Sequence, residues 1–325
     1  DNLDNLEKYL QELTSTHYGR RSLLKAMPFL LVGCATKSTS NRHREGSNKG
    51  QKTSLSVKDE VKMTKEVLPK MQKDYPAHKS ADAQRYISSL GQKIVRSSSL
   101  DGKPYRYTFT VVDVDQVNAF ALPAGTVYVT APLIKMAETE AELAGVVGHE
   151  VGHIQARHTA ERMDVAKKEQ TNSILYAIGG GVIGGLAGAA LAKAVCKPKD
   201  RECMNRVVKY GALAGGAGGL LIQKYGFMAN SREDEMEADR VGFRTSVAAG
   251  YHKDYVGNFY EKLLNMEKKH SGGGSGVLKS VADAMSTHPP SKERVTQMKQ
   301  MAKKEKLGKN TLISSKDFDR IKKLV

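Results

Sequence analysis

The chain has 325 residues, 40% of them hydrophobic, which is enough to bury a full core and suits one catalytic domain with extensions. Its formal net charge is +16, but it carries no recognised nucleic-acid-reading motif and no basic face interleaved with aromatic residues, so nucleic acid is not expected as a partner. An anionic membrane surface is the simpler partner, with 292–309 as the most concentrated basic segment, and general solubility is the alternative explanation.

Residues 1–33 resemble an export signal. The pair Arg20-Arg21 precedes an apolar stretch, as in twin-arginine signals, and Leu31-Val32-Gly33-Cys34 matches a lipobox whose cysteine would be acylated. The apolar stretch is short and contains Pro28, so an uncleaved membrane-proximal segment is the alternative. Ala35 is not the aspartate that retains lipoproteins in the inner membrane. The predicted location is therefore the bacterial periplasm, anchored to the outer membrane through Cys34, with the inner membrane as the alternative.

Residues 34–56 are polar and basic and predict a flexible tether. We expect one catalytic domain over 57–307, followed by a basic C-terminal tail over 308–325. The domain opens with two predicted amphipathic helices, Val57–Lys73 and Ala81–Arg96.

Three predicted strands follow, each marked by alternating or β-branched residues: 105–113, 117–122 and 126–130. Within the second, Asn118, Ala119, Phe120 and Ala121 are candidates for binding an extended peptide, which adds a strand to an exposed sheet edge. Asn118 is a poor residue for a closed apolar interior, which favours an edge. A strand in the interior of the core is the alternative.

The segment His149-Glu150-Val151-Gly152-His153 has the pattern H-E-x-x-H. Two histidines four residues apart lie one above the other on a helix, where both imidazoles can bind one Zn²⁺. Zinc held in this way acidifies a water molecule, and Glu150 is within reach to take the proton and pass it to a leaving amine. The pattern predicts peptide hydrolysis with one zinc ion per chain. Two ordinary hydrogen-bonded helix histidines are the alternative.

The helix that carries this pattern is well specified. Thr139–Glu142 has the form of a capping box, and apolar residues recur at helical spacing as far as Ile154. This predicts a buried helix, in which Glu150 would be costly unless zinc and water neutralise it. His158 lies five residues beyond His153, about 140° around the helix. It cannot reach the same metal from an unbroken helix, so we interpret it as structural.

Residues 174–223 are rich in Gly and Ala. Their first apolar stretch is long enough to cross a membrane and the second is too short to return, so we expect a close-packed helical hairpin beside the active site, with a membrane-inserted hairpin as the alternative. Cys196 and Cys203 flank the polar turn between the stretches. They should form a disulfide if the protein is exported, and two unpaired cysteines are the alternative.

The acidic segment 231–239 offers the third metal ligand. If Ser231 begins a helix, Glu235 and Asp239 share one face because they are four residues apart. Glu235 is expected to bind the metal, and Asp239 to accept the free N–H of a zinc histidine and fix its tautomer. The other acidic residues of the segment are expected on a solvated face: Glu233, Asp234 and Glu237.

Four motifs occur in a family order: Asn118–Pro123, Glu140–His153, Ser231–Asp239, and Thr287-His288-Pro289 with Arg294. In these the chain resembles the metallopeptidases that include HtpX, the CaaX prenyl proteases, mitochondrial Oma and the periplasmic lipoprotein LoiP, over about residues 57–307. The resemblance implies an α+β, zincin-like (gluzincin) fold, with a small antiparallel sheet packed on the active-site helix and helices elsewhere. Ala124-Gly125 stands where many relatives carry two glycines, which concerns a turn and not the chemistry.

The resemblance also directs attention to His288 and Arg294. His288 stands between a glycine-rich loop, 271–276, and two prolines, so it is a candidate to swing into zinc's open position and hold the enzyme latent. Alternatively, His288 or Arg294 stabilises the oxyanion formed on the scissile carbonyl. The plainest interpretation is that His288 packs at a helix start.

The function implied by the resemblance is a zinc-dependent endopeptidase of the bacterial cell envelope. Its substrates would be extended polypeptide segments of misfolded or misassembled envelope proteins, bound along 118–121. Two alternatives remain: a chaperone or outer-membrane assembly factor that rarely cleaves, and an integral-membrane protease. The complete set of catalytic residues favours the enzyme.

Overall fold

A computed structural model describes residues 48, 51, 53–98, 103–161, 232–269, 281, 284, 288 and 290–325. These residues all belong to one compact unit, which spans 41–165 and 221–325. Several predicted features lie outside the described residues: the export signal over 1–33, Cys34, most of the tether, the hairpin over 174–223, and Cys196 with Cys203. They stay predictions.

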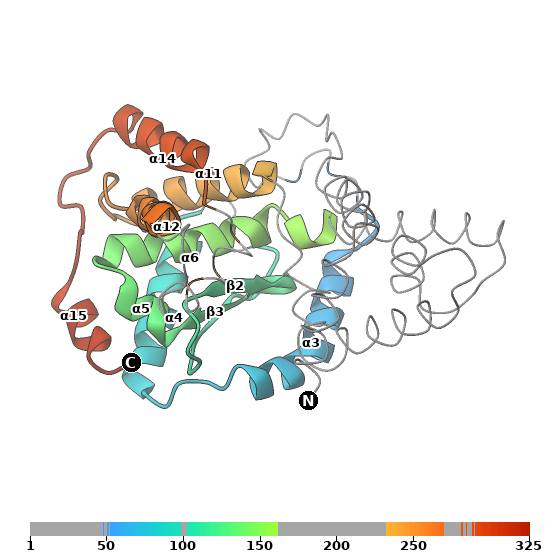
Figure 1. Ribbon diagram of the computed structural model, residues 1–325. Helices are drawn as coiled ribbons and strands as arrows, with labels where there is room; N and C mark the ends of the chain where they lie inside the picture. The colour runs from blue at the N-terminus through green and yellow to red at the C-terminus, as the bar shows by residue number, and fades with distance from the viewer. Residues whose placement is uncertain are drawn as a thin grey trace, which may run out of the picture. The chain divides into compact units, whose positions relative to one another are not determined.

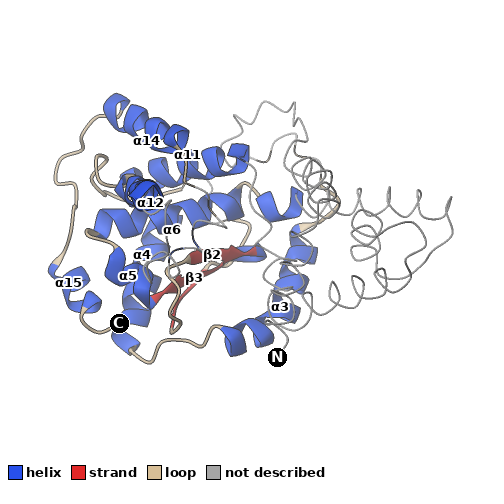
Figure 2. Ribbon diagram, viewed as in Figure 1, coloured by secondary structure: helices blue, strands red, loops and turns tan. Residues whose placement is uncertain are grey.

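The described part is α+β, as expected: helices surround one small sheet (Figure 2). Its helices are α3 (Val57–Asp74), α4 (Ala81–Arg96), α5 (Ala131–Met136), α6 (Glu140–Gln155), α11 (Arg232–Ala248), α12 (Asn258–Lys269), α14 (Lys292–Lys304) and α15 (Lys316–Lys322). Its strands are β1 (Thr108–Val112), β2 (Ala119–Leu122) and β3 (Thr126–Thr130), with a 3-10 turn, η1 (Pro123–Gly125), between the last two.

The two predicted amphipathic helices, α3 and α4, form where local signals place them. Ser56 caps α3 in a full capping box with Asp59, and the Ser80 side chain accepts from the Ala83 backbone N–H at the start of α4. Such caps satisfy amide groups that the first turn of a helix leaves unpaired. The apolar face of α4 packs on β1 and on α6.

The sheet has the strand order β1-β3-β2. Strands β2 and β3 form the expected antiparallel hairpin, but β1 runs parallel to β3. The expectation of an antiparallel sheet was therefore wrong in this detail, and the sheet is mixed. The hairpin folds so that its second strand, β3, lies in the middle, which leaves β2 at an edge. This edge position is the one expected for a peptide-binding strand.

Helix α6 lies between the sheet and the later helices (Figure 1). It packs against α11 through glycines. A methyl group built on Gly242 would lie 2.6 Å from the backbone nitrogen of His149, and one on Gly148 would lie 2.8 Å from the carbonyl oxygen of Gly242. Only hydrogen fits at these positions, so the two backbones approach directly. We call this contact, made by Gly148, Gly152 and Gly242, the glycine seam.

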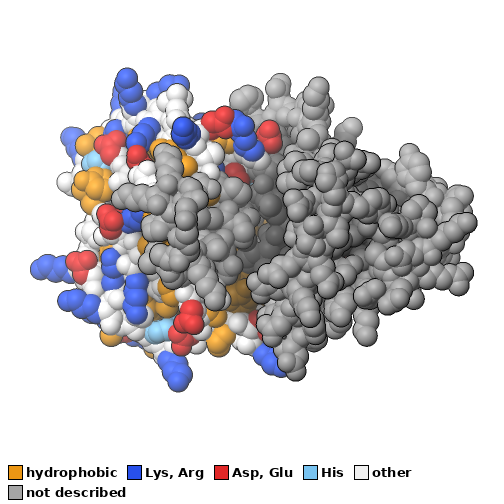
Figure 3. Space-filling model, in the orientation of Figure 1, with side chains coloured by type: hydrophobic (Ala, Val, Ile, Leu, Met, Phe, Trp, Pro, Cys, Tyr) orange, Lys and Arg blue, Asp and Glu red, His pale blue; other side chains and the backbone are white. Residues whose placement is uncertain are grey.

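The basic tail over 308–325 is part of the folded unit. Phe318 and Ile321 of α15 are fully buried in the main hydrophobic core, and α15 packs on α4. On the face seen in Figure 3, Lys and Arg side chains are spread among acidic ones. Among the described helices, none combines the length and the apolar composition needed to cross a membrane.

Candidate metal centre

The first half of the centre comes from α6. His149, Glu150 and His153 have exposed fractions of 1%, 2% and 6%, and every residue of this helix is buried. The Thr139 side chain accepts from the Glu142 N–H as predicted, but the Glu142 carboxylate accepts from the Glu138 N–H and does not complete the capping box. Burial on all sides makes α6 a rigid support for its polar side chains.

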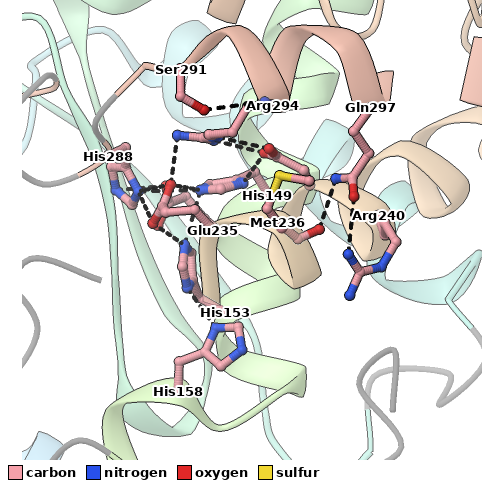
Figure 4. A network of polar contacts seen from close by, with 12 residues as sticks. His149, His153, His158, Glu235, Met236, Arg240, His288, Ser291, Arg294 and Gln297 are labelled. Atoms are coloured by element: carbon pink, nitrogen blue, oxygen red, sulfur yellow. Dashed lines mark hydrogen bonds and ion pairs between the residues drawn. The ribbon is translucent and has the colours of Figure 1, made fainter. Parts of the chain in front are cut away.

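The second half comes from α11. The glycine seam brings its first two turns against α6, so that Glu235 meets both histidines: its carboxylate oxygens lie 3.3 Å from His149 Nε2 and 3.2 Å from His153 Nε2. The two Nε2 atoms are 2.9 Å apart. The three predicted metal ligands therefore converge, although Glu235 is far from the histidines in the chain (Figure 4).

His288 brings a fourth donor. Its Nδ1 lies 3.2 Å from His149 Nε2 and 3.1 Å from a Glu235 oxygen, and its side chain is only 12% exposed. Its other ring nitrogen lies 3.3 Å from the Glu150 carboxylate. Thus His288 lies between the other three donors and Glu150.

The spacing of these donors suits a small cation. One nitrogen or oxygen from each of His149, His153, Glu235 and His288 lies within 4.8 Å of all the others. Four ligands in a tetrahedron at zinc's usual bond lengths would lie about 3.4 Å apart, close to the contacts of 2.9 to 3.3 Å found here. The chemistry of the set, three imidazoles and a carboxylate, also matches the ligands that zinc prefers in proteins.

Asp239 lies next to His149, on the side of the ring that faces away from the donor cluster. Its Oδ1 is 2.9 Å from His149 Nδ1, so the carboxylate pairs with the ring, as a carboxylate that orients a metal-binding histidine would. Burial alone would lower the pKa of His149, but Glu235 and Asp239 outweigh burial and raise it to about 9. Burial and the neighbouring His149 hold the pKa of His153 well below its usual range.

Arg294 is buried beside the two carboxylates of α11. Its guanidinium donates to Asp239 through Nε and Nη2, both at 2.7 Å, and its Nη1 lies 2.7 Å from Glu235. Burial alone would raise the pKa of Glu235, but Arg294 and the surrounding histidines hold it well below its usual range. All three nitrogens of the guanidinium are thus committed to carboxylates, an arrangement that orients the ligand and its neighbour.

Sequence reasoning misplaced two acidic residues of α11. Asp234 and Glu237, expected on a solvated face, are 2% and 0% exposed, whereas Glu233 is exposed as expected. Glu237 Oε2 lies 3.4 Å from Nε2 of His158, which is itself fully buried. A buried carboxylate needs a partner, and one partner of Glu237 is His158, the histidine for which the sequence predicts a structural role.

The peptide-binding candidates lie on β2 and just before it. Asn118 is 4% exposed and its Oδ1 has no hydrogen-bond partner within the part of the chain that the structure describes. The Thr130 N–H donates to the Asn118 carbonyl, which makes Asn118 and Thr130 a hydrogen-bonded pair. Because such pairs alternate along an antiparallel ladder, the main-chain groups of Ala119 and Ala121 face away from β3.

Comparison with known proteins gives a consistent set of matches. The sequence model of Peptidase family M48 matches residues 81–302. The beta-barrel assembly-enhancing protease of Escherichia coli O157:H7 is 25% identical over 266 residues, 82% of this chain and 48% of that protein. Metalloprotease LoiP of Escherichia coli strain K12 is 24% identical over 277 residues, 84% of this chain and 93% of that protein.

A mitochondrial protein also matches the chain. Mitochondrial metalloendopeptidase OMA1 of Arabidopsis thaliana is 30% identical over 184 residues, 57% of this chain and 29% of that protein. The chain spans about half the length of the beta-barrel assembly-enhancing proteases that it matches.

Proposed function

Because the chain belongs to peptidase family M48, we propose that it is a zinc-dependent endopeptidase of the bacterial cell envelope. Its substrates are extended segments of misfolded or misassembled envelope proteins. The proposal draws its chemistry from the donor cluster and Glu150, and its setting from the relatives and from the signal-like residues before Cys34.

His149, His153 and Glu235 would hold the zinc ion, and the remaining position, next to His288, would be left for water or the scissile carbonyl. The chemistry that zinc supplies when bound is polarisation of the scissile carbonyl and acidification of water. Asp239 and Arg294 keep the ligands in the correct ionisation state and orientation: Asp239 through the His149 proton, and Arg294 through its bonds to both carboxylates.

Glu150 is the general base. Its carboxylate is 2% exposed, and burial raises its pKa, which brings the carboxyl closer to the range in which it can both take and return a proton near neutrality. It takes a proton from the attacking water and delivers it to the nitrogen of the leaving peptide. The observation that carries the proposal is the distance of 3.3 Å between the Glu150 carboxylate and Nε2 of His288, because it places the proposed base directly beside the donor cluster.

The substrate lies along β2. The outward main-chain groups of Ala119 and Ala121 offer a ladder to an extended peptide, which gives affinity with little demand on side chains. A small cleft is lined both by residues at the end of this strand, Ala121 and Leu122, and by His153 and Arg157. A peptide paired with β2 would therefore pass close to the donor cluster.

Glu150→Gln tests the mechanism. The variant should retain about one zinc ion per chain, while hydrolysis of casein or of a fluorogenic peptide falls by at least about a hundredfold, because the ligands survive and the base is lost. His149→Ala and Glu235→Ala should lose the metal as well as the activity. Normal cleavage by zinc-loaded Glu150→Gln protein would refute this mechanism, and full cellular function of that variant would favour a chaperone.

A further inference from the structure

His158 lies directly behind one of the predicted metal ligands. Its Nδ1 is 2.8 Å from Nδ1 of His153, the ring nitrogen that faces away from the donor cluster, and its side chain has no exposed surface (Figure 4). His158 is not one of the four clustered donors. It contacts the predicted ligand His153 from the side that faces away from the metal position.

The path of the chain explains how His158 returns to His153. Helix α6 ends at Gln155, and Arg157 adopts the left-handed backbone conformation, with φ 53°. This conformation is uncommon for a residue with a side chain and needs support from its surroundings. The support comes from α3 and the segment before it: the Arg157 guanidinium lies 3.2 Å from Glu60 and donates to the carbonyl of Leu55.

The proton positions follow from the chemistry of the ligand. A histidine that binds a metal through Nε2 carries its proton on Nδ1. His153 must then donate from Nδ1, and His158 must accept at its own Nδ1. The proton of a neutral His158 is consequently on Nε2, which faces the Glu237 carboxylate at 3.4 Å and Asp234 at 3.7 Å.

We propose that His158, supported by Glu237, is a positioning residue that fixes the tautomer and ring orientation of His153. It does for His153 what Asp239 does for His149, with a neutral imidazole as the acceptor in place of a carboxylate. This inference rests on the metal binding that the proposed function assigns to His153. His158 and Glu237 are both buried and take no direct part in the proposed reaction, and positioning His153 gives each of them a role.

Two substitutions of His158 distinguish the effect of losing the hydrogen-bond acceptor that faces His153 from the effect of losing the imidazole ring. In His158→Asn, the amide oxygen takes the place of the ring Nδ1 and can still accept from His153. In His158→Gln, the amide reaches the place of Nε2, next to Glu237, and the acceptor facing His153 is lost. The pair is matched because both side chains are amides of similar polarity.

The experiment measures zinc affinity by competition with a chromophoric chelator, and ligand geometry by the visible absorption of the Co²⁺-substituted full chain. Loss of such an outer partner typically weakens metal binding about 10–100-fold, and we expect this loss, with an altered Co²⁺ spectrum, for His158→Gln. His158→Asn should remain within about threefold of wild type. Thermal unfolding of the metal-free proteins shows whether each variant is folded.

Each result either supports or overturns the positioning role of His158. Wild-type zinc affinity in folded His158→Gln would overturn the proposal. If His158→Gln does not fold, His158→Leu takes its place as the variant without an acceptor: an affinity about tenfold or more below that of His158→Asn supports the role, and equal affinity in the two variants overturns it. A wild-type chain that binds no zinc would instead overturn the proposed function, because the two variants would then have nothing to change.

Discussion

Arg294 connects two carboxylates that would otherwise destabilise the centre. Glu235 and Asp239 are buried side by side on α11 and both are acidic. Leaving one buried charge without its partner typically costs about 3–5 kcal/mol. The planar guanidinium donates to Asp239 in a fork and reaches Glu235 with its remaining nitrogen, a geometry that lysine cannot reproduce. Arg294 thus makes an acidic pair compatible with a protein interior.

His288→Ala should change proteolysis in a direction that reveals its role. His288 contacts both the donor cluster and Glu150. If it occupies the position needed by water, basal cleavage of a fluorogenic peptide should rise. If it stabilises the oxyanion, kcat should fall by roughly 10²–10³-fold with zinc content unchanged.

A matched control is Lys292→Ala, an exposed change just beyond the same segment. It should leave both cleavage and zinc content as they are. Unchanged activity and unchanged zinc affinity in His288→Ala would exclude both roles and leave His288 as a packing residue.

For single residues of the centre, helical spacing predicted which side chains share one face of a helix. His149 with His153, and Glu235 with Asp239, are pairs at i and i+4 on buried helices, so each pair shares a face whatever the rest of the chain does. His158 escaped the same reasoning because α6 ends at Gln155 and Arg157 turns the chain back. A left-handed arginine held by Glu60 and Leu55 depends on contacts about a hundred residues away, which spacing does not encode.

The glycine seam sets the distance between the two helices of the centre. Gly242→Ala should lower the free energy of unfolding by about 1–3 kcal/mol, the usual range for overpacking a well-packed core, because the added methyl group meets rigid backbone at His149 and Gly148. Zinc affinity should fall too, since any separation of α6 from α11 moves Glu235 away from the histidines. Urea unfolding and chelator competition measure the two effects.

Gly308→Ala is the control. The nearest atom to a methyl group there would be Cγ2 at the end of the Thr311 side chain, at 3.3 Å, and no backbone of another element lies against it. We expect a change in unfolding free energy within about 1 kcal/mol and no change in zinc affinity. Equal losses in the two variants would show that the seam has no special part in placing the ligands.

The edge position of β2 in the described sheet gives a second test among the elements. Ala121→Pro removes an N–H that points away from β3, and proline is tolerated on an edge strand when its missing N–H faces outward. The variant should bind zinc as wild type does but show a raised KM for peptide substrates. Phe120→Pro, which removes an N–H directed at β3, should destabilise the hairpin instead. An unchanged KM in a folded Ala121→Pro protein would contradict binding along this edge.

The strands and helices themselves followed local signals closely, but the pairing of the strands did not. Alternation and β-branched residues marked β1, β2 and β3, and the turn over 123–125 joined the hairpin. The parallel pairing of β1 with β3 depends on how β1 packs against α4 and how the hairpin packs against α6, and both are tertiary contacts. Length and periodicity identify an element, and the packing of distant surfaces decides its neighbours.

For the molecule as a whole, metal removal should reduce stability. An ion that binds the folded chain and not the unfolded one contributes about 4 kcal/mol when its concentration is a thousand times Kd. For a domain of this size, chelation should then lower Tm by roughly 10 °C. Differential scanning calorimetry with and without EDTA measures the shift. His149→Ala, which lacks a ligand, should unfold at the same temperature in both conditions, and a wild-type Tm that ignores EDTA would argue against a bound ion.

The glycine seam also limits which residues this chain can accept. At Gly148, Gly152 and Gly242 the space that a side chain would need is already filled by the facing helix, so nearly every substitution there separates α6 from α11. Exposed positions of α11, such as Arg232 and Glu233, have no such constraint. In a library of random variants selected for activity, the three glycines should therefore stay unchanged while those exposed positions vary freely.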